Sequence, residues 1–218
     1  MKKENSDNSN IDSKNKLIRQ NSAKISAPPS RIKITNALKI LLKDKDFNSI
    51  TTAEISRMAG VNESLIYRHF DDKRGLLHAV LSEYLNEFVS NLIFDLKGIK
   101  GAINKIRKFV WASIHYYDDD RVFSRILLLE VRSFPGYFES ETYQIVKQYT
   151  GLLMEIIEEG VKTGSIREDI GPSSIRQFIM GSIEHFCLPA IIFEHKIDND
   201  VMADNLCEIL FNGIVKKK

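Results

Sequence analysis

Three adjacent side chains, Tyr67, Arg68 and His69, concentrate polar chemistry in the stretch VNESLIYRHF. A phenol, a guanidinium and an imidazole can all bind phosphate oxygens, and the guanidinium can also bind the edge of a guanine base. The stretch lies between Gly60 and Asp71-Asp72, so it predicts a helix that is too short and too polar to be a core element. Such a segment is typical of a helix that offers its outer face to nucleic acid.

Catalytic and metal-binding patterns are sparse elsewhere. His115 and His185 could be read as acid-base groups, but no nucleophile, CxxC, HExxH or phosphate-cradling motif accompanies them. Cys187 and Cys207 lie far apart in a chain without a secretory signal, which favours free buried thiols over a disulfide. We therefore expect no enzyme activity, no metal site and no cofactor.

The composition is that of a globular protein. The chain has 218 residues, of which 43% are hydrophobic and 28% charged, and its formal charge of +2 neither demands nor excludes a nucleic-acid partner. No apolar run approaches the roughly 18 residues of a membrane span, and the polar N-terminus lacks the apolar segment of a signal peptide. Its long helices also lack the basic face of a membrane-surface helix. We expect a cytoplasmic protein with no membrane partner.

The elements around the stretch form a helix-turn-helix pattern. Ser30 is placed to cap a first helix that ends near Asp44, and Thr51 begins a second helix with a capping box, Thr51-x-x-Glu54. Gly60 is suited to end that helix in a left-handed conformation, and Asn62 is placed to cap the third. The predicted inward faces are Ile34, Leu38 and Leu41 or Leu42 in the first helix and Ile55, Met58 and Ala59 in the second.

On a helix wheel, the third helix has one inward and one outward side. Ile66 and Phe70 fall together and can anchor the helix, whereas Ser64 and Arg68 fall nearly opposite them. The outward side therefore suits a major groove.

Apolar residues continue at helical spacing to the C-terminus, which predicts an all-α fold of about nine helices. Asp71-Asp72 caps a long fourth helix that ends near Gly98. Five more helices are expected at about 101–118, 120–132, 139–163, 172–195 and 199–216. The first 29 residues are polar and richer in basic than acidic side chains. They predict a flexible tail, either without a specific role or serving as an arm that adds phosphate contacts.

The segments from Thr51 to Asn62 and from Leu65 to Leu77 resemble the signature of the TetR family of bacterial transcriptional repressors. The pattern A-G-V-x-x-x-x-x-Y-x-H-F-x-x-K carries this resemblance, which covers about residues 31–80. Beyond residue 80 only the helical architecture and the length agree. After the flexible polar tail that composition predicts over 1–29, the resemblance implies a helix-turn-helix DNA-binding domain over 30–75 and a helical regulatory and dimerisation domain over 76–218.

The resemblance also implies roles for single residues. Tyr67, His69 and Lys73 fall on positions that contact phosphate, and Glu63, Ser64 and Arg68 fall on positions that contact bases. Leu65 stands where Thr is frequent, so it either packs or touches a thymine methyl. Gly75 stands where Glu is common, which we expect to loosen the first turn of the fourth helix. The predicted DNA-contacting set is Thr51, Thr52, Asn62, Glu63, Ser64, Leu65, Tyr67, Arg68, His69 and Lys73.

For the C-terminal bundle, the resemblance implies an effector pocket and a dimer interface. The candidate pocket residues, for each of which ordinary core or surface placement is the alternative, are Trp111, His115, Phe123, Leu127, Arg132, Tyr149, Leu153, Glu184 and His185. The candidate interface residues on the last two helices, which a monomer core would also explain, are Phe178, Ile179, Phe186, Met202, Leu206, Ile209, Leu210 and Gly213.

The function implied is that of a homodimeric, ligand-responsive regulator, in the first place a repressor that binds a palindromic double-stranded DNA operator. The abundance of Phe, Leu and Ile indicates a lipophilic effector. The stretches GSIREDI at 164–170 and GSIEH at 181–185 resemble those of family members that sense acyl-CoA or other lipophilic metabolites, which implies a small lipophilic effector such as an acyl-CoA or a fatty acid. The alternative is a structural DNA-binding protein on the same fold that responds to no effector. The sequence leaves the operator, the effector and the choice between repression and activation open.

Overall fold

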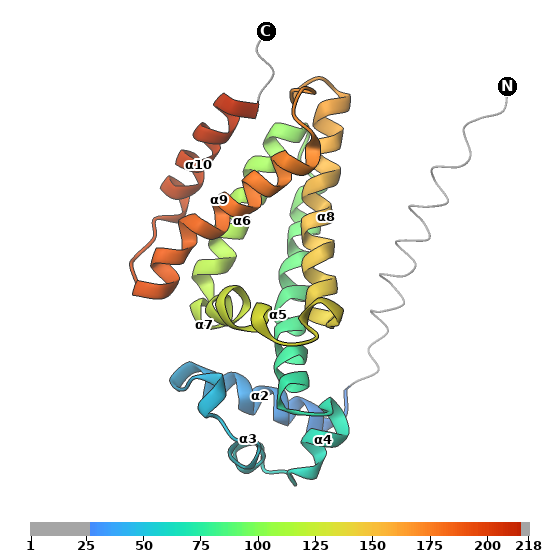
Figure 1. Ribbon diagram of the computed structural model, residues 1–218, viewed down its shortest axis with the longest axis vertical. Coiled ribbons are helices and arrows are strands. Elements are labelled where there is room, and N and C mark those ends of the chain that lie inside the picture. Colours follow the sequence, from blue (N-terminus) through green and yellow to red (C-terminus); the bar gives the residue numbers. More distant parts are fainter. Residues whose placement is uncertain (1–26, 215–218) are drawn as a thin grey trace, which may run out of the picture.

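The computed structural model describes residues 27–214, and every regular element in that range is helical (Figure 1). The all-α prediction is therefore confirmed. The predicted tail lies almost wholly outside the described residues, so its phosphate contacts stay a prediction. The α-helices are α2 (Pro29–Asp44), α3 (Thr52–Ala59), α4 (Ser64–Phe70), α5 (Lys73–Leu96), α6 (Ala102–Asp119), α7 (Arg121–Arg125), α8 (Glu141–Lys162), α9 (Pro172–Phe193) and α10 (Asn199–Ile214).

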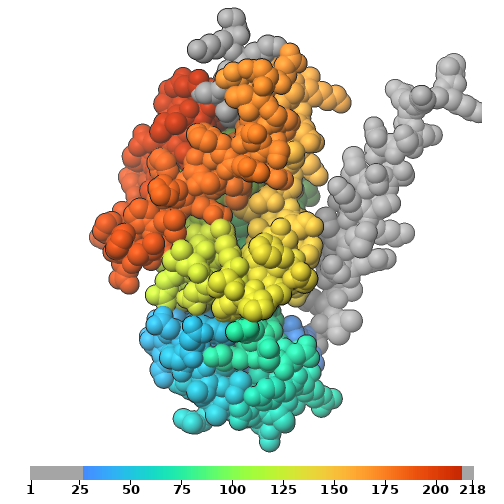
Figure 2. Space-filling model, in the orientation of Figure 1, coloured from blue at the N-terminus to red at the C-terminus, as the bar shows by residue number. Residues whose placement is uncertain are grey.

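Helices α2, α3 and α4 form a small unit at one end of the molecule, and α5 runs from this unit into the larger bundle (Figures 1 and 2). The predicted caps hold it together. The Thr51 hydroxyl accepts the Glu54 N–H at 3.1 Å, and Asn62 Oδ1 accepts the Ser64 N–H at 2.9 Å. Gly60 ends α3 in the left-handed region with φ 63°, where a side chain would be strained.

Two predictions about this unit are wrong. Ser30 does not cap α2, because the helix already begins at Pro29, whose ring fixes φ at a helical value and which has no N–H to satisfy. Met58 is 47% exposed, whereas Ile55 and Ser56 are buried. At about 100° per residue, the buried face of α3 is centred between Ile55 and Ser56, and Met58 lies well to one side of it.

Gly75 does not loosen α5. Asp72 caps the helix by accepting the Gly75 N–H at 2.7 Å, and the Phe70 carbonyl oxygen occupies the place where a Cβ on Gly75 would stand. The same carbonyl accepts the Asp72 N–H at 2.7 Å across Asp71, whose φ is 64°, a tight γ-turn. Glycine is therefore required here by the close approach of the backbone that joins α4 to α5.

The prediction of a single helix over residues 120–132 is wrong. Helix α7 stops at Arg125 and is followed by η2 (Ile126–Glu130), a π-helical turn, and by the 3₁₀ turns η3 (Val131–Ser133) and η4 (Tyr137–Glu139). Ile126, Leu127 and Leu128 are all buried, and three consecutive side chains do not share one face of an α-helix. The wider turn allows all three to face the core.

The other helices of the bundle begin and end within a few residues of their predicted bounds.

Outside the bundle, a third 3₁₀ turn, η1 (Phe47–Ser49), joins α2 to α3. Cys187 and Cys207 are free and buried, as predicted. In residues 27–214 no helix combines the length and apolarity needed to cross a membrane.

Candidate nucleic-acid interface and ligand cavities

Helix α4 has the predicted two sides. Ile66 and Phe70 are buried against α2 and α5, while Ser64, Tyr67 and Arg68 are exposed. Tyr67 leaves 51% of its surface in solvent, although an aromatic ring would gain from burial. The outer side of α4 therefore presents a phenol, a guanidinium and a hydroxyl that nothing in the small unit covers.

The start of this surface is organised by hydrogen bonds between α3 and α4. Thr52 Oγ1 donates to the Glu63 carboxylate, which ties the side chain ahead of α4 to the first turn of α3. Thr51 and Asn62 use their side-chain oxygens as caps, so they orient the two helices. Leu65 is half-buried and packs against the core, which agrees with its packing alternative.

The end of α4 meets the start of α2. His69 Nε2 lies 2.9 Å from Ser30 Oγ, and Arg31 Nη1 donates to the His69 carbonyl oxygen at 3.1 Å. The Arg31 guanidinium also covers the ring of Phe70, 4.5 Å from its centroid. Sequence analysis missed Ser30 and Arg31 as neighbours of this surface, and the only local signal was their position at the start of the first helix.

Lys73 is occupied within the chain. Its ammonium donates to the carbonyl oxygens of Phe47 at 2.9 Å and Ile50 at 2.7 Å. It also lies 4.4 Å from the centroid of the Phe47 ring. Burial, followed by the charge of Arg74, lowers the pKa of Lys73. In this structure Lys73 joins α5 to η1, and its predicted phosphate contact stays a prediction.

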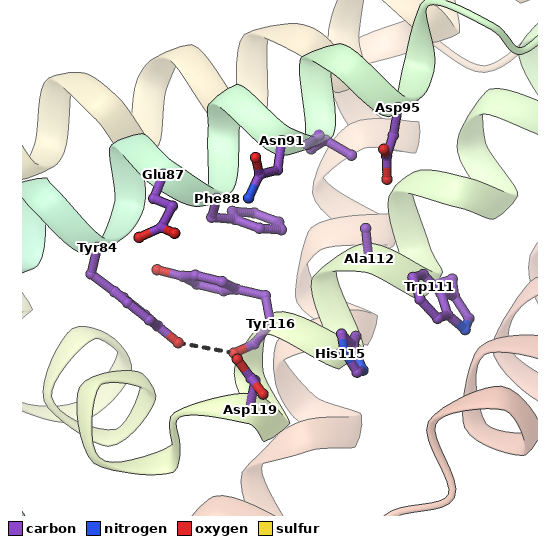
Figure 3. Close-up of a pocket in the computed structure, with 11 residues that line it drawn as sticks. Tyr84, Glu87, Phe88, Asn91, Asp95, Trp111, Ala112, His115, Tyr116 and Asp119 are labelled. Atoms are coloured by element: carbon purple, nitrogen blue, oxygen red, sulfur yellow. Dashed lines mark hydrogen bonds between the residues drawn. The ribbon is translucent and has the colours of Figure 1, made fainter.

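Two neighbouring cavities of the bundle include predicted pocket residues in their linings. The first, which we call the outer cavity, has a volume of about 280 Å³ and lies between α5 and α6 (Figure 3). Both aromatic rings and carboxylates border it. Its lining includes Tyr84, Glu87, Phe88, Asn91, Leu92 and Asp95 from α5 and Trp111, Ala112, His115, Tyr116 and Asp119 from α6.

The second, which we call the inner cavity, is smaller and more apolar, with a volume of about 120 Å³. It lies between α5, α6, α8, α9 and the irregular segment after α7. Its lining is Leu85, Phe88, Tyr116, Tyr117, Leu127, Arg132, Val146, Tyr149, Thr150, Met180 and Glu184. Arg132 and Glu184 pair there through two hydrogen bonds of 2.9 and 2.7 Å.

The predicted pocket residues divide between these cavities. Trp111 and His115 line the outer one, and Leu127, Arg132, Tyr149 and Glu184 line the inner one. Three others, Phe123, Leu153 and His185, are not among the lining residues of these two cavities. Phe123 packs against the Tyr84 ring, with centroids 5.1 Å apart, Leu153 is wholly buried in the core, and His185 is exposed on α9.

Phe88 and Tyr116 were missed, although they line both cavities. The signal that could have found them is the i, i+3, i+4 spacing of Tyr84, Glu87 and Phe88, which puts aromatic and acidic groups on one side of α5. Sequence periodicity identifies such a side as buried, but does not show that it borders a cavity.

The irregular segment connects the inner cavity to the small unit. Arg132 lies at the cavity, and two residues further on Phe134 packs against Phe47 of η1, with ring centroids 6.2 Å apart. Before it, Arg125 donates to Asp46 at 2.9 Å. Arg132 is therefore only two residues away from Phe134, which directly contacts the loop that precedes α3.

Helices α9 and α10 expose several large apolar side chains. Phe178 and Ile209 are 54% and 57% exposed, while Phe186 and Met202 are half-buried. Ile179, Leu206 and Leu210 are buried inside this chain, which agrees with their monomer-core alternative, because both helices also pack on α6 and on each other. The surroundings of Gly213 lie outside the described residues. Exposed residues that sequence analysis omitted from the interface are Ile192, Phe193 and Val201.

Comparison with known proteins gives two matching family models. Bacterial regulatory proteins of the tetR family match residues 34–80, and the C-terminal region of YsiA-like protein matches residues 81–213. The fatty acid metabolism regulator protein of Bacillus subtilis (strain 168) is 23% identical over 189 residues, which cover 87% of this chain and 97% of that protein. The repressor DhaR of Mycobacterium sp. (strain GP1) is 21% identical and is matched over 79% of this chain and 85% of its own.

Solved structures agree with this fold. The regulator FadR from Bacillus subtilis in complex with stearoyl-CoA has a TM-score of 0.75 at 23% identity, with 84% of this chain and 98% of that chain covered. FadR from Bacillus halodurans has a TM-score of 0.76 at 20% identity, with coverage of 86% and 97%.

Proposed function

This chain belongs to the TetR family of bacterial regulatory proteins, and from that premise we propose that it represses transcription by binding a palindromic operator as a homodimer. It is a ligand-responsive DNA-binding regulator, and its site of action is the cytoplasm, where bacterial DNA lies. We assign DNA binding to residues up to about 75 and regulation and dimerisation to the rest. The family consists of regulators rather than enzymes, and we propose no catalytic role.

The observation that carries this proposal is the uncovered outer side of α4. Arg68 is suited to the O6 and N7 acceptors of guanine, and Tyr67 and His69 to phosphate oxygens. Because Thr52 holds the Glu63 carboxylate, Glu63 is presented in a fixed position beside Ser64 and can accept from a cytosine amino group. Leu65 is assigned to packing at the edge of the interface.

A dimer follows from the size of the reading element. One short helix buries too little surface to hold a specific site, and such modules work as pairs on half-sites about 34 Å apart. The exposed apolar residues of α9 and α10, led by Phe178 and Ile209, form a surface that a second copy would cover. We propose this surface as the dimer interface.

We propose the inner cavity as the place of the effector's apolar part. Apart from the paired Arg132 and Glu184 and a few hydroxyls, its lining is aliphatic and aromatic, which fits a long alkyl or acyl chain. The relative from Bacillus subtilis is named for fatty acid metabolism, and its structure holds stearoyl-CoA. A long-chain acyl-CoA is therefore the first effector to test.

The irregular segment provides a route from effector to DNA. A ligand that displaces Arg132 would move Phe134 against Phe47 and Arg125 against Asp46, and so shift η1 and α3 relative to α5. The two copies of α4 would then no longer match successive half-sites. An effector acts in this way only if it binds the DNA-incompatible arrangement more tightly.

The test is a mobility-shift titration on an operator selected from genomic DNA. We expect Arg68→Ala and Tyr67→Phe to weaken binding, and Lys147→Ala, which removes one exposed charge from α8, to bind like wild type. Retained affinity in both α4 variants, with folds intact, would remove the proposal. Addition of oleoyl-CoA should release the protein from the operator. If no acyl compound or other metabolite changes operator binding, the result supports the alternative of a structural DNA-binding protein that responds to no effector.

A further inference from the structure

We propose that Phe88 and Tyr116 form a partition that opens to join the outer and inner cavities, and that the effector is an amphiphile with an N–H-bearing head group. Its apolar chain passes the partition into the inner cavity, and its head group lies between Glu87 and Asp119. This inference rests on the proposed function, because it describes how an effector occupies the regulatory bundle.

The partition consists of two stacked rings. The centroids of Phe88 and Tyr116 lie 4.0 Å apart with 24° between the ring planes, and Tyr84 stacks on Tyr116 at 4.5 Å. Figure 3 shows the Tyr116 ring directly beside Phe88 in the space between α5 and α6. Phe88 and Tyr116 are the two residues common to both cavity linings. A rotation of these side chains would therefore connect the two spaces.

The Tyr116 hydroxyl gives an independent indication that the site takes a ligand. Tyr116 is only 9% exposed, and its hydroxyl has no hydrogen-bond partner among the residues that the structure describes. The nearby Tyr149 hydroxyl, in contrast, lies 2.6 Å from Ser113 Oγ. A buried hydroxyl without a partner is unfavourable, because it has lost its hydrogen bonds to water. In Figure 3 it points toward the Glu87 side of the outer cavity, where a polar group of a ligand could satisfy it.

Cavity size also favours a joined site. Pockets that take drug-sized ligands measure about 300–1,000 Å³. The outer cavity, at about 280 Å³, and the inner cavity, at about 120 Å³, each fall below this range. Joined, they lie within it. The inner cavity alone holds only the end of a long chain, so such a ligand must also extend into the outer one.

The charges decide which head group fits. Arg132 is the one Lys or Arg side chain in the two linings, and Glu184 already neutralises it through a double hydrogen bond. Among the outer carboxylates, Asp95 pairs with Lys108 at 2.8 Å. Glu87 and Asp119 form no ion pair within the described part of the chain.

In the described linings, an anionic head group would therefore find two exposed carboxylates and no Lys or Arg without a carboxylate partner, whereas an amide or ammonium N–H would find two acceptors. This arrangement favours an N–H-bearing head group over a free fatty acid. An acyl thioester fits only if the amide groups of its linker, and not its phosphates, lie beside Glu87 and Asp119.

The first experiment compares head groups at constant chain length. Calorimetric titration of the full chain without DNA uses dodecanamide, dodecylamine and dodecanoate. Wild type should bind the amide and the amine at least about tenfold more tightly than the carboxylate, because Glu87 and Asp119 repel an anion and accept hydrogen bonds from N–H groups. The double variant Glu87→Gln, Asp119→Asn should lose most of this preference. Equal or tighter binding of dodecanoate by wild type would overturn the proposal.

The second experiment tests the partition. Val146→Phe and, independently, Thr150→Phe fill the inner cavity and should weaken dodecanamide binding about tenfold or more while leaving hexanamide, which fits the outer cavity, within about twofold. Tyr116→Leu removes half of the partition and should accelerate association of dodecanamide. Thermal melting identifies any variant that does not fold. Wild-type affinity in both cavity-filling variants, or an unchanged association rate, would contradict the partition.

These binding measurements are separate from operator binding. The head-group and cavity-filling experiments can contradict their predictions while the protein still binds the operator and an effector still releases it. In that case only the partition and the proposed ligand class are wrong. If the α4 variants bind the operator like wild type, the proposed function falls whatever the ligand data show.

Discussion

At the scale of single residues, two buried tyrosines provide a matched pair. Tyr149 shares a hydrogen bond with Ser113, whereas the Tyr116 hydroxyl has no partner within residues 27–214. Tyr149→Phe should lower the free energy of unfolding by about 1 kcal/mol. Tyr116→Phe should leave it unchanged or raise it, because an unsatisfied buried hydroxyl is removed. Urea unfolding at one fixed protein concentration measures both, and an equal loss in the two variants would contradict this account of Tyr116.

A titratable contact between α5 and α8 predicts a pH dependence. His78 Nδ1 lies 2.9 Å from Thr142 Oγ1, and burial lowers the pKa of His78 below its usual 6.5, against the opposing charge of Asp72. The unfolded chain therefore takes up a proton on His78 before the folded chain does. The stabilisation due to neutral His78 is complete above pH 6.5 and is lost as pH falls through the lower folded pKa.

Replacement of this histidine tests that dependence. His78→Asn keeps a donor near Thr142 but does not titrate, so its free energy of unfolding should fall less steeply than that of wild type between pH 7 and pH 5. Urea unfolding at a series of pH values measures the two slopes. Parallel slopes would assign the acid sensitivity of the chain to other groups.

At the scale of elements, the turn between α4 and α5 predicts the effect of adding one methyl group. Gly→Ala inside a helix is usually stabilising by about 1 kcal/mol, and Gly151→Ala in α8 should show this, because open space surrounds that position. Gly75→Ala should instead destabilise, since its Cβ would meet the Phe70 carbonyl. Chemical unfolding compares the two variants, and a stabilised Gly75→Ala would contradict the observed turn.

The elements also show how far sequence reasoning reaches. Caps such as Thr51, Asn62 and Asp72 act over three residues or fewer, so helix starts could be predicted closely. The π-helical turn at η2 could not, because it depends on several neighbouring elements that bury Ile126, Leu127 and Leu128 together. The exposed side of α4 could be predicted because it depends on the periodicity of one helix, and its contacts with DNA stay a prediction. The inner cavity needs side chains from six elements, and Phe88 and Tyr116 were missed.

At the scale of the whole molecule, the proposed dimer depends on exposed apolar side chains of α9 and α10. Phe178→Glu combined with Ile209→Glu should convert the dimer to a monomer, because each charge would be buried unpaired in the interface. Phe94→Glu is the control, since Phe94 is 75% exposed on α5, outside that surface. Sedimentation equilibrium measures the mass. A dimeric double variant, or a monomeric Phe94→Glu, would place the interface elsewhere.

The central claim is that two copies of α4 read a palindrome. Fragmented genomic DNA, captured by the purified protein and sequenced, tests it most directly. The account predicts one enriched motif with two inverted half-sites about one helical turn apart. Arg68→Ala, captured in parallel, should lose the preference at one base pair of each half-site. Capture without an enriched palindrome, or the same motif and strength with Arg68→Ala, would contradict the account.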